Sequence, residues 1–168
     1  ARGRYPTAQL LNVRDELYLI DCGEGTQERL RMAGVNFNRI GRIFISHMHG
    51  DHYLGLMGLL SSMHLQGRSR ELHVHGPADL KEVVHLQLRV SQTYLRYPMH
   101  IHAVASVSGE VIMEDDRVTV TALALKHRLP CTGLVVKERA GLRSLRKEML
   151  PVIPAYRRAG VKQGEDLV

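Results

Sequence analysis

The sequence predicts a mixed α/β (α+β) domain in which sheets stack face to face and helices lie outside them. Two observations favour this class. Strand-like and helix-like segments interchange along the first half of the chain without strict β-α-β alternation, and strand-like segments dominate from residue 100 to residue 137. With 168 residues, the chain is long enough for one domain with a sizeable core.

Each element is placed by its apolar periodicity and by the turn residues that bound it. Thr26 is expected to cap the first helix, and Gly34 stands where that helix should stop. Residues 53–65 are apolar on several faces, which indicates a helix packed deep against a sheet. The predicted strands are residues 17–20, 42–46, 72–75, 100–107, 118–125 and 134–137, and the predicted helices are residues 26–32, 53–65 and 78–90.

The last part of the chain differs in composition from the rest. From residue 141 the periodicity weakens, prolines stand at positions 151 and 154, and basic residues dominate. We therefore expect a core of residues 1–140 and an extended basic segment of residues 141–168. A solvated, poorly ordered tail is the alternative interpretation of that segment.

Charge and cysteine content narrow the class of protein. A net charge of +6 and a pI near 9.6 favour a polyanionic partner such as nucleic acid, although basic proteins without that function are common. No apolar run approaches the ~20 residues of a membrane span, so no membrane partner is expected. Cys22 and Cys131 form no C-x-x-C pair and are expected to be small buried residues. We therefore expect a cytoplasmic location, because the reducing cytoplasm suits cysteines that form no disulfide framework.

The motif H-M-H-G-D-H at residues 47–52 directly follows a predicted buried strand. Imidazole nitrogen and carboxylate oxygen are ligands that Zn²⁺ prefers. In an extended stretch, alternation would send His47, His49 and Asp51 to one side. One metal cannot easily use four groups from so short a segment, so the motif predicts two adjacent metals. The first would take His47 and His49. The second would take Asp51 and His52.

Other histidines are weaker candidates. His73 and His75 face one side of a predicted strand, as do His100 and His102, and either pair could bind metal by spacing alone. Neither pair is joined by a third histidine or a carboxylate in a tight turn. Packing or surface roles are therefore favoured for all four.

Several segments resemble, in order, the signatures of one family. They are D-C-G-E-G-T-Q at residues 21–27, F-I-S-H-M-H-G-D-H at residues 44–52, G-L-M-G-L-L at residues 55–60, L-H-V-H-G-P at residues 72–77, L-R-Y-P at residues 95–98, and the strand-like segment from residue 120 through His127 to Gly133. This set resembles the ribonuclease Z family of metallo-β-lactamase fold hydrolases. The metal motif marks the superfamily, whereas D-C-G-E-G-T-Q and the glycine–leucine helix point to ribonuclease Z.

The resemblance implies a metallo-β-lactamase-like αββα sandwich, here mainly its N-terminal half. It implies two Zn²⁺ ions per complete active site, with His47, His49 and His127 on the first zinc. Asp51 and His52 would begin the second zinc site, and Asp51 would act as ligand and as the catalytic proton acceptor. The bridging aspartate and a last metal histidine of the family would come from a C-terminal half, so the chain looks incomplete.

The resemblance also implies substrate and partners. The family removes the 3′ trailer from precursor tRNA, is commonly a homodimer, and carries a protruding tRNA-binding arm. That arm falls on the basic segment, which makes Arg143, Arg146 and Lys147 candidate substrate-binding residues. Asp21 could accept the N–H of a metal-bound imidazole, and a plain turn-forming aspartate is the competing interpretation.

Two other functions stay open at this point. One is a hydrolase of small phosphodiesters, esters or thioesters that uses the same metal chemistry. The other is a half-length chain that binds tRNA or a partner without cutting it. A chain of only 168 residues is expected to be inactive and to hold at most one zinc tightly, since Asp51 and His52 would lack partners.

Overall fold

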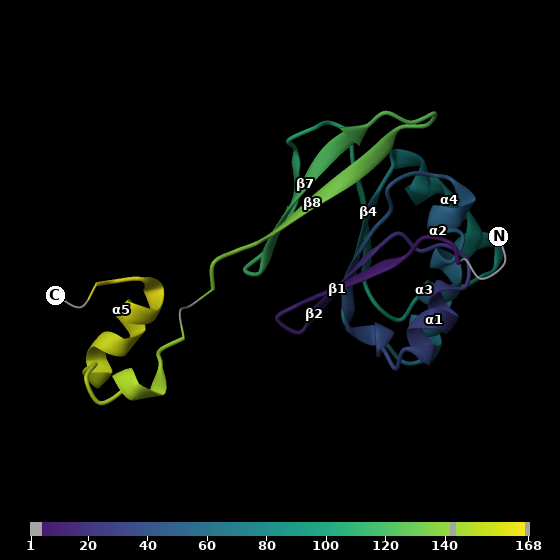
Figure 1. Cartoon of the computed structure of the whole chain (residues 1–168). Coiled ribbons are helices and arrows are strands. Elements are labelled where there is room, and N and C mark those ends of the chain that lie inside the picture. Colours follow the sequence, from purple (N-terminus) through teal and green to yellow (C-terminus); the bar gives the residue numbers. More distant parts are fainter. Residues whose placement is uncertain (1–4, 142–143, 167–168) are drawn as a thin grey trace.

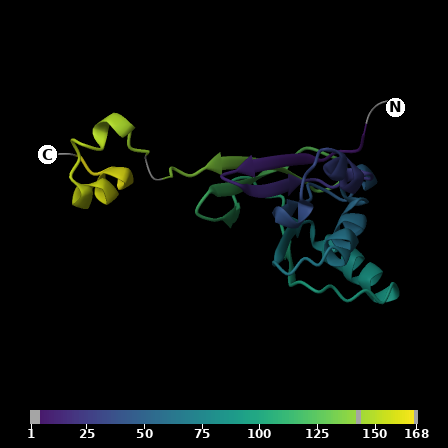
Figure 2. The same ribbon diagram turned by 90° about the horizontal axis from the view of Figure 1, so that it is seen from below.

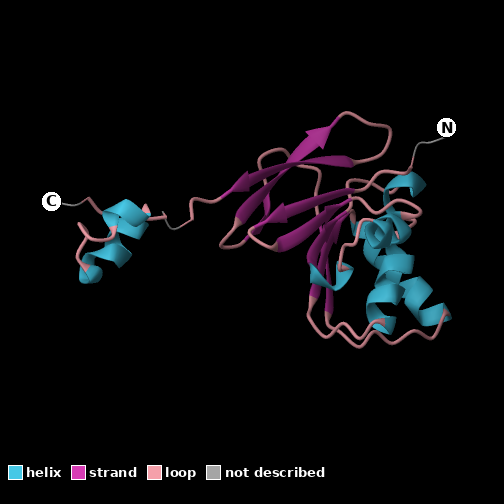
Figure 3. Ribbon diagram, turned by 60° about the horizontal axis from the view of Figure 1, so that its bottom comes forward, coloured by secondary structure: helices cyan, strands magenta, loops and turns pink. Residues whose placement is uncertain are grey.

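Two β-sheets lie face to face in the computed structural model, and helices cover the free side of the first sheet (Figures 1 and 3). The structure describes residues 5–141 and 144–166. The first sheet has the order β1 (Gln9–Val13), β2 (Glu16–Ile20), β3 (Ile40–Phe44), β4 (Leu72–Gly76) and β5 (Met99–Ala103). The second sheet has the order β6 (Val111–Glu114), β7 (Val118–Leu125) and β8 (Cys131–Glu138).

The two sheets differ in strand direction. β1 and β2 form an antiparallel hairpin, whereas β2 to β5 run parallel, and the second sheet is antiparallel throughout. Parallel neighbours need long crossover connections, and the helices lie in these connections. They are α1 (Thr26–Met32), the 3₁₀ turn η1 (Phe37–Arg39), α2 (Gly50–Tyr53), α3 (Leu56–Leu65) and α4 (Ala78–Val90).

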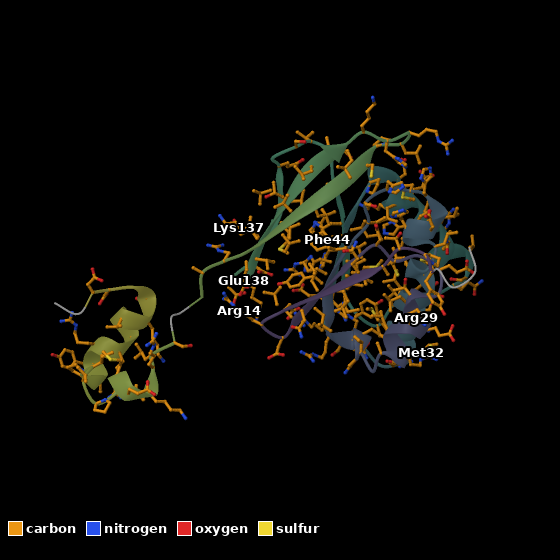
Figure 4. All side chains as sticks on the ribbon, viewed as in Figure 1. Arg14, Arg29, Met32, Phe44, Lys137 and Glu138 are labelled. Carbon is orange, nitrogen blue, oxygen red and sulfur yellow. The ribbon has the colours of Figure 1, made fainter. Side chains whose placement is uncertain are left out.

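The first sheet contributes to a hydrophobic core on each of its faces. Ile43 packs with Leu59 and Met63 in the core on the helical side, and all three are fully buried. The next residue, Phe44, points to the other face and packs with Val118 and Val120 of the second sheet (Figure 4). Alternation along β3 therefore explains why this segment is apolar without interruption. The layers are helix, sheet and sheet, as expected for the first part of the sandwich.

The strand before the metal motif begins and ends two residues earlier than predicted, because β3 covers residues 40–44 and not 42–46. The Ser46 N–H donates to the Asp21 carboxylate at 2.8 Å, so it leaves the strand ladder. The single helix predicted for residues 53–65 is divided into α2 and α3. The division falls at Gly55, whose N–H donates to the Cys22 carbonyl at 2.9 Å.

The helices of residues 26–32 and 78–90 and the strand of residues 118–125 match the prediction in type and bounds. The cap assignment for α1 was wrong, because Gly25 occupies the N-cap position. The Thr26 hydroxyl instead donates to the Gly23 carbonyl at 2.7 Å. β1 and β6 were not predicted, and the strand expected at residues 100–107 ends at Ala103.

Beyond β8, the chain leaves the sheets next to an ion pair between Arg14 and Glu138 (3.1 Å; Figure 4). The described residues of the basic segment form η2 (Lys147–Met149), η3 (Ala155–Arg157) and α5 (Arg158–Gln163), short helical turns that the sequence did not predict. Figures 1 and 2 show this part away from the sheets. Within it, Arg158 donates to the carbonyl of Ile153, whose side chain is buried. Among the described helices, none has the length and apolar character needed to cross a bilayer.

Candidate metal centre

Three histidines from two separate parts of the chain converge at one end of the sandwich. His47 Nε2 lies 2.9 Å from His49 Nδ1, and His127 Nε2 lies 3.1 Å from the same atom. Their ligand atoms all fall within 4.8 Å of one another. A tetrahedral Zn²⁺ with Zn–N bonds near 2.05 Å would hold such nitrogens about 3.3 Å apart. The spacing and the imidazole chemistry therefore fit a metal ion.

His127 reaches this group through the packing of the two sheets. It follows the end of β7 by two residues, whereas His47 and His49 follow β3. The Thr132 N–H donates to the Ser46 carbonyl at 3.0 Å, which joins the start of β8 to the loop before the motif. This contact holds the two loops side by side.

The other two motif residues form a neighbouring pair. Asp51 lies in the first turn of α2, so the extended alternation predicted for it was wrong, and its side chain is 64% exposed. Asp51 Oδ2 lies 3.6 Å from His52 Nε2. The His52 ring lies 4.0 Å, centroid to centroid, from the ring of His47. The structure thus separates a group of three histidines from an adjacent Asp–His pair.

Asp21 contacts both groups of residues, His52 directly and His47 through Ser46. Its carboxylate is 4% exposed and accepts from the Ser46 N–H (2.8 Å), the Ser46 hydroxyl (3.1 Å) and His52 Nδ1 (2.7 Å). Because Nδ1 of His52 is the donor in this bond, its Nε2 carries the free lone pair on the side of Asp51. The geometry thus supports the positioning role considered for Asp21 and exceeds what a turn-forming aspartate requires.

Ser46 fixes the protonated nitrogen of His47 in a similar way. Since the Ser46 hydroxyl donates its one proton to Asp21, its oxygen accepts from His47 Nδ1 at 2.9 Å. Nε2 of His47 is then the unprotonated nitrogen, and it faces His49. Sequence reasoning did not identify Ser46 as a functional residue, because a serine at a strand end carries no chemical signal by itself.

Burial affects the protonation of the site. Burial, together with the neighbouring imidazoles, lowers the pKa of His47, which favours the neutral form that binds metal. Cys131 Sγ lies 3.6 Å from His47 Nδ1, and burial raises the pKa of that thiol. Burial likewise raises the pKa of Cys22 to about 12. Both cysteines are buried thiols, as the sequence predicted.

Backbone contacts among three segments fix the motif in place. The Cys22 N–H donates to the His52 carbonyl at 2.7 Å, and the Gly55 N–H donates to the Cys22 carbonyl. A Cβ at Gly23 would lie 3.1 Å from the Asp51 carbonyl carbon and closer still to its oxygen. Gly23 and Gly55 therefore permit the close backbone approach that positions Asp51 and His52.

A cavity of about 340 Å³ adjoins the site, with Asp21, His47, His52 and Cys131 in its wall. A larger cavity of about 460 Å³ lies between α1 and α3 on the helical side, and no histidine lines it. The ligand chemistry places the candidate centre at the first cavity.

Comparison with known proteins gives the family. The family model described as "Anti-Pycsar protein Apyc1" matches residues 1–143, which include the whole metal motif and His127. The chain belongs to the anti-Pycsar protein Apyc1 family.

The chain also resembles ribonuclease Z in sequence and structure. It is 40% identical over 166 residues to ribonuclease Z of Bacteroides fragilis, a match that covers 98% of the chain and 55% of that relative. The crystal structure of human tRNase Z, short form, superimposes with a TM-score of 0.72 at 31% identity, covering 81% of this chain and 61% of that one. The predicted resemblance to ribonuclease Z is confirmed.

The metallo-β-lactamase fold is confirmed as well. The fold protein YhfI of Bacillus subtilis superimposes with a TM-score of 0.62 at 18% identity, covering 90% of this chain and 61% of that one. This Apyc1-family chain spans about half the length of the curated relatives it matches.

The structure brings together His47, His49 and His127, and it places Asp51 and His52 beside them. Arg146 and Lys147 lie exposed in the basic segment, while Arg143 falls outside the described residues.

Proposed function

We propose that this chain carries the metal-binding part of a zinc-dependent endoribonuclease that removes the 3′ trailer from precursor tRNA. The observation that carries the proposal is the convergence of His47, His49 and His127 beside the Asp51–His52 pair. The relatives named ribonuclease Z and tRNase Z supply the substrate class. Since the chain spans about half of those relatives, their activity is carried over as a proposal.

The donor set determines what each residue does. His47, His49 and His127 hold one Zn²⁺, and Asp51 and His52 supply two ligands of a second site. When bound, zinc polarises the phosphodiester and makes water acidic enough to attack it at neutral pH. Asp51, whose side chain is 64% exposed, would accept the proton of the attacking water. Asp21 and Ser46 keep Nε2 of both His52 and His47 free to bind.

The basic segment of residues 141–168 is proposed as a tRNA-binding arm on a core of residues 1–140. Figures 1 and 2 show its described part standing away from the sheets, where a large substrate could reach it. Arg143, Arg146 and Lys147 would contact phosphates and position the tRNA without reading its bases. Replacing all three with alanine should weaken tRNA binding and lower the salt slope of log Kd by about one unit per lost contact. An unchanged salt slope would rule out the arm.

The proposal is tested by cleavage of precursor tRNA beside bis(p-nitrophenyl) phosphate. In the active protein, His49→Ala should abolish cleavage, while His85→Ala, at an exposed position on α4, should leave it within two-fold. Retained turnover in His49→Ala would mean that the metal assignment is wrong. Cleavage of the small ester alone would defeat the tRNA assignment.

A second candidate is a hydrolase of small phosphodiesters with the same metal chemistry. It stays a candidate because the family model that matches this chain bears a name other than ribonuclease Z. A third candidate, tRNA binding without cleavage, would show tRNA retention with no product. We further propose a cytoplasmic location and a homodimer, and light scattering of the purified protein tests the homodimer directly.

A further inference from the structure

Outside the metal centre, an aromatic ring and a guanidinium form an exposed pair between α1 and the segment before β1. The guanidinium carbon of Arg29, on α1, lies 4.0 Å from the ring centroid of Tyr5, over one face of the ring (Figure 4). Tyr5 nevertheless remains 64% exposed, so the other face of its ring is open to solvent. The pair therefore offers a flat apolar surface that is backed by a positive charge.

The backbone that follows Tyr5 holds it next to the metal motif. The Thr7 N–H donates to the Asp51 carbonyl at 3.0 Å, and the Thr7 carbonyl accepts from the Gly23 N–H at 3.0 Å. Two residues of extended chain span about 7 Å, so the Cα of Tyr5 lies within about 10 Å of the Asp51 carbonyl oxygen. Stacked nucleotides rise ~3.4 Å each, so a strand with a phosphate at the metal centre needs about three nucleotides to cover this distance.

Pro6 restricts this aromatic surface before any ligand binds. A residue that precedes a proline is confined to extended conformations, which limits the freedom of the Tyr5 backbone. Pro6 in turn packs against Gly23, where a Cβ would overlap the Cβ of the proline. A flat ligand that stacks on a ring already held in place loses less conformational entropy than one that must first order it.

Arg29 carries a charge that no acidic side chain of the described residues neutralises by an ion pair. The exposed Glu28 precedes it on α1 and lowers the local positive potential. A guanidinium binds a phosphate through its planar set of N–H donors, while an adjacent aromatic ring stacks on a base. This combination is typical of surfaces that bind single-stranded nucleic acid.

We propose that Tyr5 and Arg29 form a subsite for one unpaired nucleotide of the RNA substrate, close to the phosphate that is cleaved at the metal centre. The proposal rests on the proposed endoribonuclease function. The open face of Tyr5 stacks on the base, and Arg29 contacts a neighbouring phosphate. Because every base has a π-face, the subsite positions the strand without selecting its sequence.

Binding of single-stranded RNA to the metal-free chain tests the subsite apart from cleavage. Fluorescence anisotropy measures the affinity for a short labelled strand of mixed sequence. Tyr5→Ala should weaken binding about 5- to 150-fold, the range for loss of one base–aromatic stack, whereas Tyr5→Phe should stay within two-fold. Arg29→Gln should lower the salt slope of log Kd by about 0.7, as expected for one lost phosphate contact. Tyr94→Ala, at an 84% exposed tyrosine, is the matched control and should bind as wild type.

Strands that lack one base distinguish stacking from a structural role of Tyr5. At one position, removal of the base should weaken binding as much as Tyr5→Ala does, and Tyr5→Ala should then cause no further loss. If Tyr5 only packs the segment before β1 on α1, Tyr5→Ala lowers Tm and no missing base cancels its effect on binding. If Tyr5→Ala fails to fold, Tyr5→Leu, which has no ring, replaces it.

The proposal is overturned if Tyr5→Ala binds the intact strand as wild type does, if Tyr94→Ala loses as much affinity, or if no missing base cancels the Tyr5 effect. Cleavage of precursor tRNA by the active protein separates these results from a failure of the proposed function. Tyr5→Ala should raise the KM for precursor tRNA, and normal cleavage with an unchanged KM would refute the subsite alone. Base-dependent binding through Tyr5 without any cleavage would support the subsite and refute the endoribonuclease.

Discussion

Gly55→Ala is expected to damage the metal centre from a position that binds no metal. Gly55 has ordinary helical angles (φ −77°, ψ −13°), so an alanine is not opposed by backbone strain there. A Cβ at this position would lie 2.8 Å from the carbonyl carbon of Gly23 and 2.9 Å from the carbonyl oxygen of Cys22, and closer still to the Gly23 oxygen. These are backbone atoms, so relief requires that the turn after β2 move away from α3.

The clash lowers the free energy of unfolding by an amount that can be worked out. Overpacking of this kind costs about 1–3 kcal/mol, and the backbone clash places Gly55→Ala at the upper end, about 3 kcal/mol. For a chain of this length, that corresponds to a fall in Tm of roughly 6–12 °C. The same shift moves Cys22, whose N–H bonds to the His52 carbonyl, and Asp21 beside it. Zinc affinity should therefore fall together with stability.

Gly58→Ala is the matched control, three residues further along α3. Its Cβ would lie 3.1 Å from Gln27 Oε1, the end of a flexible side chain. Alanine is about 1 kcal/mol better than glycine inside a helix, so this variant should be neutral or up to ~1 kcal/mol more stable. Urea unfolding and zinc titration of both variants measure the difference. Equal stabilities for Gly55→Ala and Gly58→Ala would refute the reasoning.

Two further predictions concern buried ionisable groups. Asp21→Asn should weaken zinc binding about 10- to 100-fold in calorimetry and leave the circular dichroism spectrum unchanged. The control Asp15→Asn, at an exposed position, should leave zinc binding unchanged. Equal zinc affinities for the two variants would mean that Asp21 only forms the turn. Burial lowers the pKa of His75 from 6.5 to about 3, so the unfolded chain binds the extra proton between these values. The free energy of unfolding should therefore fall as pH drops from 6.5 toward 3, by at most ~1.4 kcal/mol per pH unit from this group. His75→Phe, which preserves ring stacking, should reduce that slope in urea unfolding at several pH values, and an unreduced slope would contradict the assignment.

Segments with strong local signals were predicted well. The helix of residues 78–90 and the strand of residues 118–125 have clear periodicity and match in bounds. β1 was missed because its hairpin turn uses Arg14 and Asp15 at positive φ (49° and 65°), without the glycine that usually marks such a turn. The local sequence pattern therefore did not predict β1, because residues that rarely adopt positive φ close its hairpin turn.

The candidate site was predictable to different degrees. The first histidines of the motif stand together in the sequence, so their chemistry was visible there. His127 lies 78 residues from His49 and was identified only through family resemblance, because a lone histidine after a strand predicts nothing. The Tyr5–Arg29 contact depends on how the segment before β1 packs beside α1, which no spacing along the sequence reveals.

Metal content at low free zinc tests the central claim most directly. With free zinc held in the nanomolar range by a chelator, the wild-type chain should retain one zinc, held by His47, His49 and His127. His127→Ala should lose that zinc under the same conditions, while His85→Ala should keep it. A His127→Ala chain that holds as much zinc as wild type would show that the three histidines do not form the metal centre.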